Sequence, residues 1–163
     1  MQVIIFILAV LALSFPILGF LIYIRILDKH SKRIESAYIP HSIGIFKNLN
    51  VWVKNTDFPK NKFNLDLFKT SYEFNNCDLI LGLENIILIG KQKSFGKIIH
   101  LTPKILFNKD IETNHAKVIR IQNTRLNMDI IEIDFLDPEY PKTMTLVIKN
   151  SPLELRKKII NEL

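Results

Sequence analysis

The sequence predicts an α+β fold, in which an N-terminal transmembrane helix precedes a mostly antiparallel β domain that a C-terminal amphipathic helix closes. Three observations support this prediction. Residues 3–24 carry no charged side chain, residues 77–149 contain short apolar stretches separated by turn residues, and residues 151–163 change to helical periodicity. The expected parts are a transmembrane helix over 1–24, a basic juxtamembrane neck over 25–40, a connecting region over 41–76 and the β domain over 77–163.

The apolar N-terminal stretch is long enough to cross a lipid bilayer as a helix. Its 22 residues, Val3 to Ile24, would form a helix of about 33 Å, and a hydrocarbon core is about 30 Å thick. A cleaved signal peptide and a buried core helix are the alternatives. A signal peptide fits less well, because no Lys or Arg precedes Arg25 and no small-residue pattern marks a cleavage site.

Basic residues directly after this stretch set the expected orientation. Positively charged flanks of a span remain on the cytoplasmic side, so we expect the N-terminus outside and residues 25–163 inside. This describes a single-pass protein of the cell (inner) membrane, held by a signal anchor. The basic residues could contact anionic lipid headgroups or could serve topology alone; they are Arg25, Lys29, Lys32 and Arg33.

The charge balance of the chain is basic, with 22 Lys and Arg against 16 Asp and Glu and a net charge of +6. All of these charges follow residue 24. A membrane surface accounts for this balance, and no Arg-rich stripe or recognition motif is present. We therefore expect no nucleic-acid partner.

The second half of the chain reads as a series of short strands. The alternation is clearest over 129–136, where Ile131 and Phe135 share one face and Glu132 and Asp134 share the other. Two apolar runs close together in sequence predict a hairpin. The expected strands are 79–83, 86–89, 98–101, 105–107, 117–122, 129–136 and 144–149.

The last residues of the chain predict a short amphipathic helix over 151–163. Ser151 and Glu154 form a Ser-x-x-Glu capping box around Pro152, which suits the first helical position. Leu155 and Ile159 follow with helical spacing on one face. We expect this face to pack against the β domain.

This order of elements over residues 77–163 resembles the pleckstrin-homology-like fold, as found in small bacterial proteins that join a membrane span to such a domain. The resemblance implies binding of phospholipid headgroups, peptides or proteins, and no fixed catalytic residues. In lipid-binding members, basic residues lie in the loop that joins the first strands. The comparable stretch here is 90–97, which lacks the Arg of the family pattern and could be an ordinary solvated loop. The implied ligand-binding residues are Lys91, Lys93, Phe95 and Lys97.

Motifs that would indicate catalysis or cofactor binding are absent. The sequence has no Gly-rich phosphate loop and no zinc-binding His-Glu-x-x-His motif. The lone Cys77 cannot build a thiolate metal site, and Glu132 and Asp134 are expected on a solvated face. We therefore expect no enzyme activity, no cofactor and no metal.

Two functions agree with these observations. The first is a membrane-anchored cytoplasmic binding module, non-catalytic, that binds a protein segment or an anionic lipid headgroup. The alternative is an accessory subunit of a larger membrane protein complex that acts through its transmembrane helix.

Overall fold

The computed structural model describes residues 2–54, 72, 74–94, 96–108, 115–123, 129–138 and 142–162. A long helix, α1 (Gln2–Tyr38), leads through the short 3-10 helix η1 (Ile39–His41) into the strands, and α2 (Leu153–Glu162) ends the fold. The strands are β1 (Ser42–Lys54), β2 (Asn76–Gly82), β3 (Asn85–Ser94), β4 (Lys97–His100), β5 (Lys104–Asn108), β6 (Ala116–Asn123), β7 (Ile130–Leu136) and β8 (Met144–Lys149).

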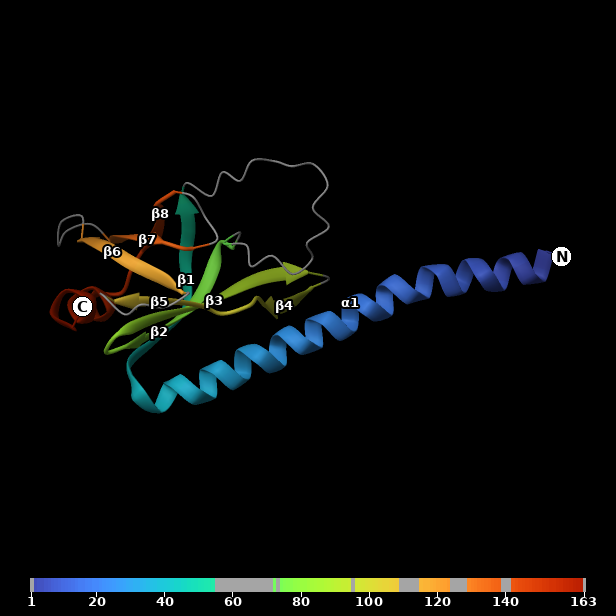
Figure 1. The fold of residues 1–163 in the computed structure, drawn as a ribbon, viewed down its shortest axis with the longest axis horizontal. Coiled ribbons are helices and arrows are strands. Elements are labelled where there is room, and N and C mark those ends of the chain that lie inside the picture. The colour runs from blue at the N-terminus through green and yellow to red at the C-terminus, as the bar shows by residue number, and fades with distance from the viewer. Residues whose placement is uncertain are drawn as a thin grey trace.

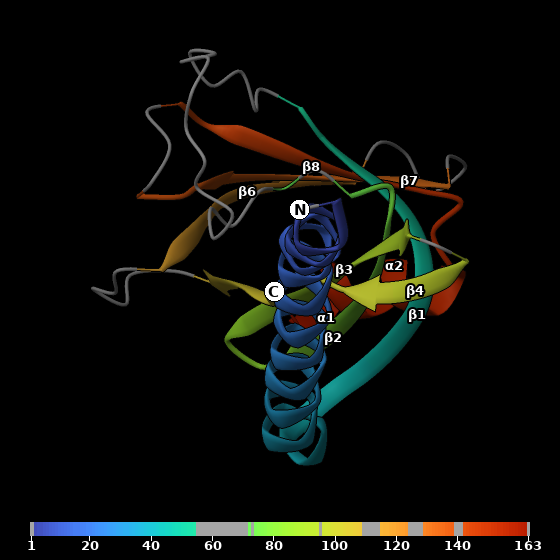
Figure 2. The same ribbon diagram turned by 90° about the vertical axis from the view of Figure 1, so that its right-hand side faces the viewer.

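The strands form one sheet that closes on itself as a barrel. The strand order is β2-β1-β8-β7-β6-β5-β3-β4, and β2 also pairs with β3. Seven strands therefore form a ring, which Figure 2 shows in a view along α1. The eighth, β4, pairs only with β3 among the described residues. The parallel β5–β6 pair is the exception in an otherwise antiparallel sheet.

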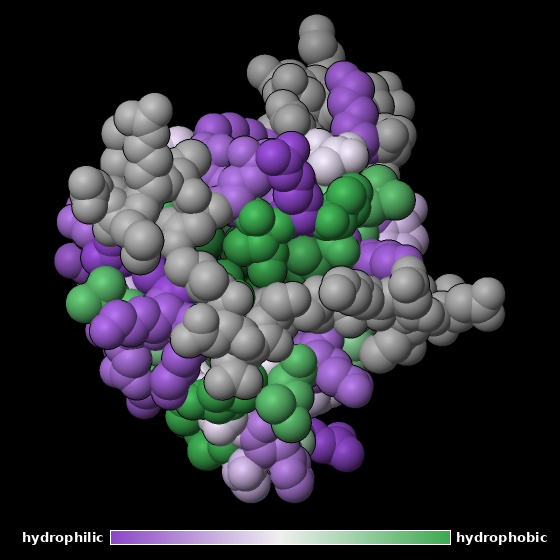
Figure 3. Space-filling view, turned by 90° about the vertical axis from the view of Figure 1, so that its left-hand side faces the viewer, coloured by the Kyte–Doolittle hydropathy of each residue, from purple (hydrophilic) through white to green (hydrophobic). Residues whose placement is uncertain are grey.

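Alternate residues of the strands fill the interior of the barrel. On β7, Ile131, Ile133 and Phe135 are fully buried, as the alternation predicts. Leu155 and Ile159 of α2 join the same core. α2 thus covers one end of the barrel, far from the free end of α1 (Figure 1). Figure 3 views that end of the molecule, where apolar surface lies among polar side chains.

A second apolar cluster holds α1 against the outer face of the barrel. Because Leu79 and Leu88 point inward, their neighbours in sequence point outward. These outward side chains of β2 and β3 are buried by α1. The cluster consists of Ile80, Ile87 and Ile89, with Ile34 and Tyr38 of α1 and Ile105 of β5 packed against them.

The N-terminal part of α1 leaves the barrel and extends away from it (Figure 1). Leu27 and Ser31 are the first described side chains of α1 that are buried. The large apolar side chains before them are exposed, and Phe15 reaches 71% exposure. The exposed apolar side chains of this part, called here the apolar segment of α1, are Phe15, Ile17, Leu18, Phe20, Leu21, Ile22 and Ile26.

The predicted fold class is wrong in its N-terminal element. One continuous helix runs from Gln2 to Tyr38, where a transmembrane helix over 1–24 and a separate neck were expected. Within the part of the chain that the structure describes, no helix is long and apolar enough to cross a bilayer. The described side chains of α1 begin at Ser14, and charged residues recur from Arg25 onward. This finding overturns the single-pass signal anchor, the outside N-terminus and the inner-membrane location.

The β domain also begins earlier than residue 77, because residues 42–54 of the expected connecting region form β1. The sequence of β1 lacks a clear alternation for a structural reason. Its register with β2 shifts between Phe46 and Leu49, and Asn48 there has a φ of 56°. Such a β-bulge inserts one residue and moves the next inward side chain by one position. The buried Phe46 and Leu49 are consequently three residues apart.

The expected hairpin and C-terminal helix are present, with one difference in detail. β2 and β3 are joined by a turn at Leu83 and Glu84. The helix starts at Leu153, and its first backbone bond runs from the Arg156 N–H to the Pro152 carbonyl. The Ser151 hydroxyl is buried without a hydrogen-bond partner among the described residues. The predicted Ser151 cap is therefore not formed.

Candidate binding site at the edge of strand β4

The residues predicted to bind a ligand lie on the β3–β4 hairpin but do not form one cluster. Lys91 and Lys93 are on β3, Lys97 begins β4, and Phe95 lies outside the described residues. Lys93 pairs with Ile98 in the register of the hairpin. Since side chains alternate between the two faces of a strand, Lys97 points to the face opposite Lys93. The hairpin therefore separates the ammonium groups.

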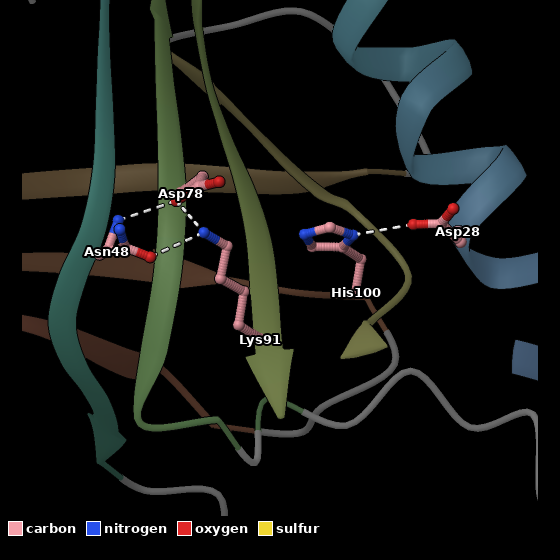
Figure 4. A network of polar contacts seen from close by, with 5 residues as sticks. All are labelled: Asp28, Asn48, Asp78, Lys91 and His100. Carbon is pink, nitrogen blue, oxygen red and sulfur yellow. Dashed lines mark hydrogen bonds and ion pairs between the residues drawn. The ribbon is translucent and has the colours of Figure 1, made fainter. Parts of the chain in front are cut away.

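Lys91 is engaged in a polar network with two other strands (Figure 4). Its Nζ lies 2.7 Å from Oδ1 of Asp78 on β2, and each side chain is only 12% exposed. Lys91 also donates to Oδ1 of Asn48 on β1 at 2.8 Å. Its ammonium group is thus occupied within the protein, so Lys91 belongs to the structure of the barrel.

The same network supports the bulge in β1. Asn48 adopts a left-handed conformation, which Asn tolerates better than most residues. A bulge disturbs the backbone ladder at this point. The Asn48 backbone N–H donates to Asp78 Oδ1 at 2.8 Å. Asp78 therefore accepts bonds from both β1 and β3 and fixes the three strands in register.

A second set of polar contacts holds α1 beside β4. His100 Nδ1 donates to Asp28 Oδ1 at 3.0 Å, and Lys32 lies 2.7 Å from Asp28 Oδ2 (Figure 4 shows the first contact). Ser31 Oγ donates to the Leu101 carbonyl at 3.1 Å. The hydrogen bond from Lys32, and then that from His100, lowers the pKa of the Asp28 carboxyl. The contact therefore involves an ionised carboxylate throughout the neutral range.

The outer edge of β4 presents backbone groups that pair with no described strand. The Leu101 N–H donates to the Gly90 carbonyl at 2.8 Å. This bond determines which residues of β4 direct their backbone groups toward β3. In an antiparallel pair, backbone groups of successive residues point alternately toward and away from the partner strand. Lys97 and Ile99 therefore face β3, whereas Ile98 and His100 direct their N–H and C=O groups away from it. No described strand pairs with this edge.

Basic and apolar side chains surround this edge. Ile98 is 63% exposed, and Lys93 and Lys97 are exposed beside it. On α1, Arg25 and Lys29 are exposed within one turn of Asp28, the residue that contacts β4. We call Lys93, Lys97, Arg25 and Lys29, together with Ile98, the β4 face; within it, Lys97 lies on the other side of the hairpin from Lys93 and Ile98.

The four residues predicted at a membrane surface all lie exposed on α1. Arg25 and Lys32 are spaced three and four residues from Asp28, and this spacing places them on one side of the helix. Lys32 is occupied by its ion pair with Asp28. Arg25 and Lys29 join the β4 face, while Arg33 lies one further turn along the helix from Lys29.

A separate polar cluster lies inside the barrel, and its groups contact one another. Tyr72 donates its hydroxyl to Asp137 Oδ2 at 2.6 Å, and Lys104 Nζ lies 4.7 Å from the centre of the Tyr72 ring. Tyr72 and Asp137 are buried. These groups are directed at one another, as expected for a buried polar cluster that supports the core.

The described residues contain no group of three or more His, Cys, Asp or Glu side chains that could hold a metal ion. Cys77 is buried in the core. Burial raises the pKa of the Cys77 thiol to about 12, and the neighbouring Asp78 carboxylate adds to the effect. The thiol is therefore protonated at neutral pH and is a poor nucleophile.

Comparisons with protein-family models, with curated proteins and with solved structures found no match to this chain. The resemblance to the pleckstrin-homology-like fold stays a prediction. The candidate site is therefore defined by its own geometry.

Sequence reasoning missed the residues that organise this site: Asp28, Asn48, Asp78, Ile98 and His100. The positive φ of Asn48 and the pairing of Asp78 with Lys91 depend on strand register, which no local pattern shows. A usable signal was present at His100, a polar residue at the end of the apolar run Ile98-Ile99.

Proposed function

We propose that this chain is a non-catalytic binding module that takes an acidic segment of a partner protein on the β4 face. The observation that supports the proposal is the grouping of exposed basic side chains around an unpaired strand edge. Lys93, Lys97, Arg25 and Lys29 have no ion-pair partner within the described part of the chain. Their charges are available to an anionic ligand.

Among the described residues, the nearby carboxylates are already paired with other cations or His and do not cancel this positive charge. Asp28 is paired with Lys32 and His100, and Asp78 is paired with Lys91. The chain as a whole carries a net charge of +6. Exposed pairs each contribute about 0–1 kcal/mol, so affinity requires several of them together. Charges at the rim of an interface also raise the association rate and make binding sensitive to salt.

Charge reversal tests this proposal. The test variant combines Lys93→Glu, Lys97→Glu, Arg25→Glu and Lys29→Glu. The control carries Lys142→Glu and Lys157→Glu, two exposed positions elsewhere on the fold, and a second test variant with only Lys93→Glu and Lys97→Glu matches its charge change. The probe is a fluorescent peptide of about ten alternating glutamate and valine residues, a length that suits strand-like recognition. Fluorescence anisotropy measures its affinity for the full chain.

We expect the four-fold reversal to weaken binding by about 100-fold and the two-fold reversal by about tenfold, or about 1.4 kcal/mol. The control should stay within about twofold, because surface changes away from a site have small effects. Equal losses in control and matched variant would refute the β4 face as the site. Binding to phosphatidylglycerol vesicles without binding to the peptide would replace the protein ligand by an anionic lipid headgroup.

A further inference from the structure

We infer that recognition at this face occurs by strand addition, in which the acidic segment pairs with β4 through the backbone groups of Ile98 and His100. The inference rests on the proposed function of the same face and adds the mode of binding to it. The structure supports it in three steps, which concern the edge, the side chains beside it and the position of α1.

The first step is that β4 carries an open edge of the sheet. Each strand of the closed ring has a neighbouring strand on both sides along part of its length, whereas β4 pairs only with β3 among the described strands. Ile98 and His100 together offer two N–H donors and two C=O acceptors pointing away from β3. Unpaired groups of this kind are a template for another strand. Main-chain bonds of an added strand supply affinity, and its alternate side chains supply specificity.

The second step is that the two faces of β4 differ in chemistry. On one face, the residue of β4 that an added strand would lie beside is the exposed Ile98, whose partner on β3 is Lys93. On the other face it is the exposed Lys97. Neighbouring strands align their side chains by face. An added strand would therefore place apolar residues beside Ile98 and acidic residues beside Lys97. A segment with alternating acidic and apolar residues matches both faces, and this defines the chemistry of the partner.

The third step is that α1 bounds one end of this edge. The Asp28–His100 contact, which Figure 4 shows, and the Ser31–Leu101 contact hold α1 at the C-terminal end of β4. The opposite end, at Ile98 and Lys97, is exposed. Arg25 and Lys29 lie within one turn of the Asp28 contact. An added strand would enter from the Ile98 end and meet the positive charges of α1 at the other.

A modified peptide separates strand pairing from charge. The glutamate–valine peptide is compared with a version N-methylated at alternate residues, which keeps every charge but cannot donate along one edge. Ile98→Pro removes the outward N–H of β4 and leaves the bonds to β3 intact, since Ile98 does not face β3. Ile98→Ala is the control, because it removes the side chain and keeps the N–H. Binding is measured by anisotropy on the full chain.

We expect N-methylation and Ile98→Pro each to weaken binding by about tenfold or more, and Ile98→Ala by less than about threefold. Amide hydrogen exchange at Ile98 and His100 in the unmodified chain should slow when the parent peptide binds. This readout needs no variant, so it decides the matter even where Ile98→Pro disturbs the hairpin. Slow exchange with the parent peptide and not with the methylated one supports strand addition.

Two other outcomes would distinguish a failure of strand addition from a failure of the proposed function. If the methylated peptide binds as tightly as the parent and the charge reversal weakens both, strand addition is wrong and the proposed function stands. If the charge reversal has no effect on either peptide, both proposals fail.

Discussion

Lys91 on β3 and Asp78 on β2 form an ion pair of 2.7 Å on the outer side of the barrel, and the Asn48 backbone N–H of β1 donates to the same carboxylate oxygen. Cys77 and Leu79, the neighbours of Asp78, point into the core. The pair is therefore separated from the core only by the thickness of the sheet. These contacts link three consecutive strands of the ring at the bulge.

Removing the cation of this pair should destabilise the fold. Lys91→Ala leaves Asp78 nearly buried without its counter-charge, and we expect a loss of about 3 kcal/mol in the free energy of unfolding. Lys93→Ala, at an exposed position two residues along the same strand, should cost less than about 0.5 kcal/mol. Urea denaturation followed by circular dichroism measures both. Similar values for the two variants would show that the ion pair contributes little.

Gly90 should not tolerate a side chain, because Phe74 lies over it. A Cβ at Gly90 would sit 2.6 Å from the Cδ1 atom of the Phe74 ring. We expect Gly90→Ala to cost about 1–3 kcal/mol through overpacking. Gly19→Ala in α1, where nothing lies within 4 Å, should not lower the unfolding midpoint. In the double variant with Phe74→Leu, the cost should be smaller than the sum of the single costs; additive costs would contradict this contact.

Cys77 should make stability fall at high pH. The pKa of its thiol is about 12 in the folded chain, while an unfolded cysteine ionises near pH 8.5–9, roughly its ordinary pKa. The unfolded state therefore binds fewer protons between about pH 9 and 12, and stability falls by up to about 1.4 kcal/mol per pH unit over that range. Below about pH 8 the thiol stays protonated in both states and the contribution is fully present.

The measurement compares the native chain with Cys77→Ala by chemical denaturation at several values between about pH 8 and 11. The difference between the two slopes isolates the thiol from other titrating groups. The folded chain should also resist a thiol-specific reagent until it unfolds. Rapid labelling under native conditions would show that Cys77 is reachable without global unfolding.

The apolar segment of α1 should make the isolated chain associate in water. Its side chains project on all sides of the helix, and exposed apolar surface of this extent is uncommon on monomers. We expect Leu18→Gln with Leu21→Gln to shift the molecule toward monomer in sedimentation velocity, without lowering the unfolding midpoint of the barrel. The matched control is Ile119→Gln with Leu136→Gln, two exposed apolar positions on the barrel. An equal shift in the control would assign association to the barrel instead.

The strands that were predictable are those whose surroundings impose a simple pattern. β7 has one face in the core and one in polar surroundings, so Ile131, Ile133 and Phe135 alternate with acidic residues. β2 and β3 lack alternation because α1 buries their outer face, and their continuous apolar runs still predicted strands. β1 could not be predicted, because the bulge at Asn48 moves the inward side chains out of phase.

The candidate site was only partly predictable for a similar reason. The sequence predicted a loop over 90–97 between strands over 86–89 and 98–101, whereas β3 continues to Ser94 and β4 begins at Lys97. Lys93 and Lys97 are exposed there. The engagement of Lys91 depends on which strand lies beside β3, and local sequence does not contain that information. A helix apolar on every side is typical of a membrane span. Because residues 1–24 have this pattern, a transmembrane helix was wrongly predicted there.

The position of β4 limits how many chains can join by the proposed mode. Among the described strands only β4 has a neighbouring strand on one side alone, so addition to β4 has room for a single strand. Sheets with two open margins can grow into ribbons by repeated pairing. Here the first strand that pairs with β4 leaves no further open position at that edge. Two copies of the chain that paired through their β4 strands would each block the edge of the other. Growth by this route would stop at a one-to-one complex.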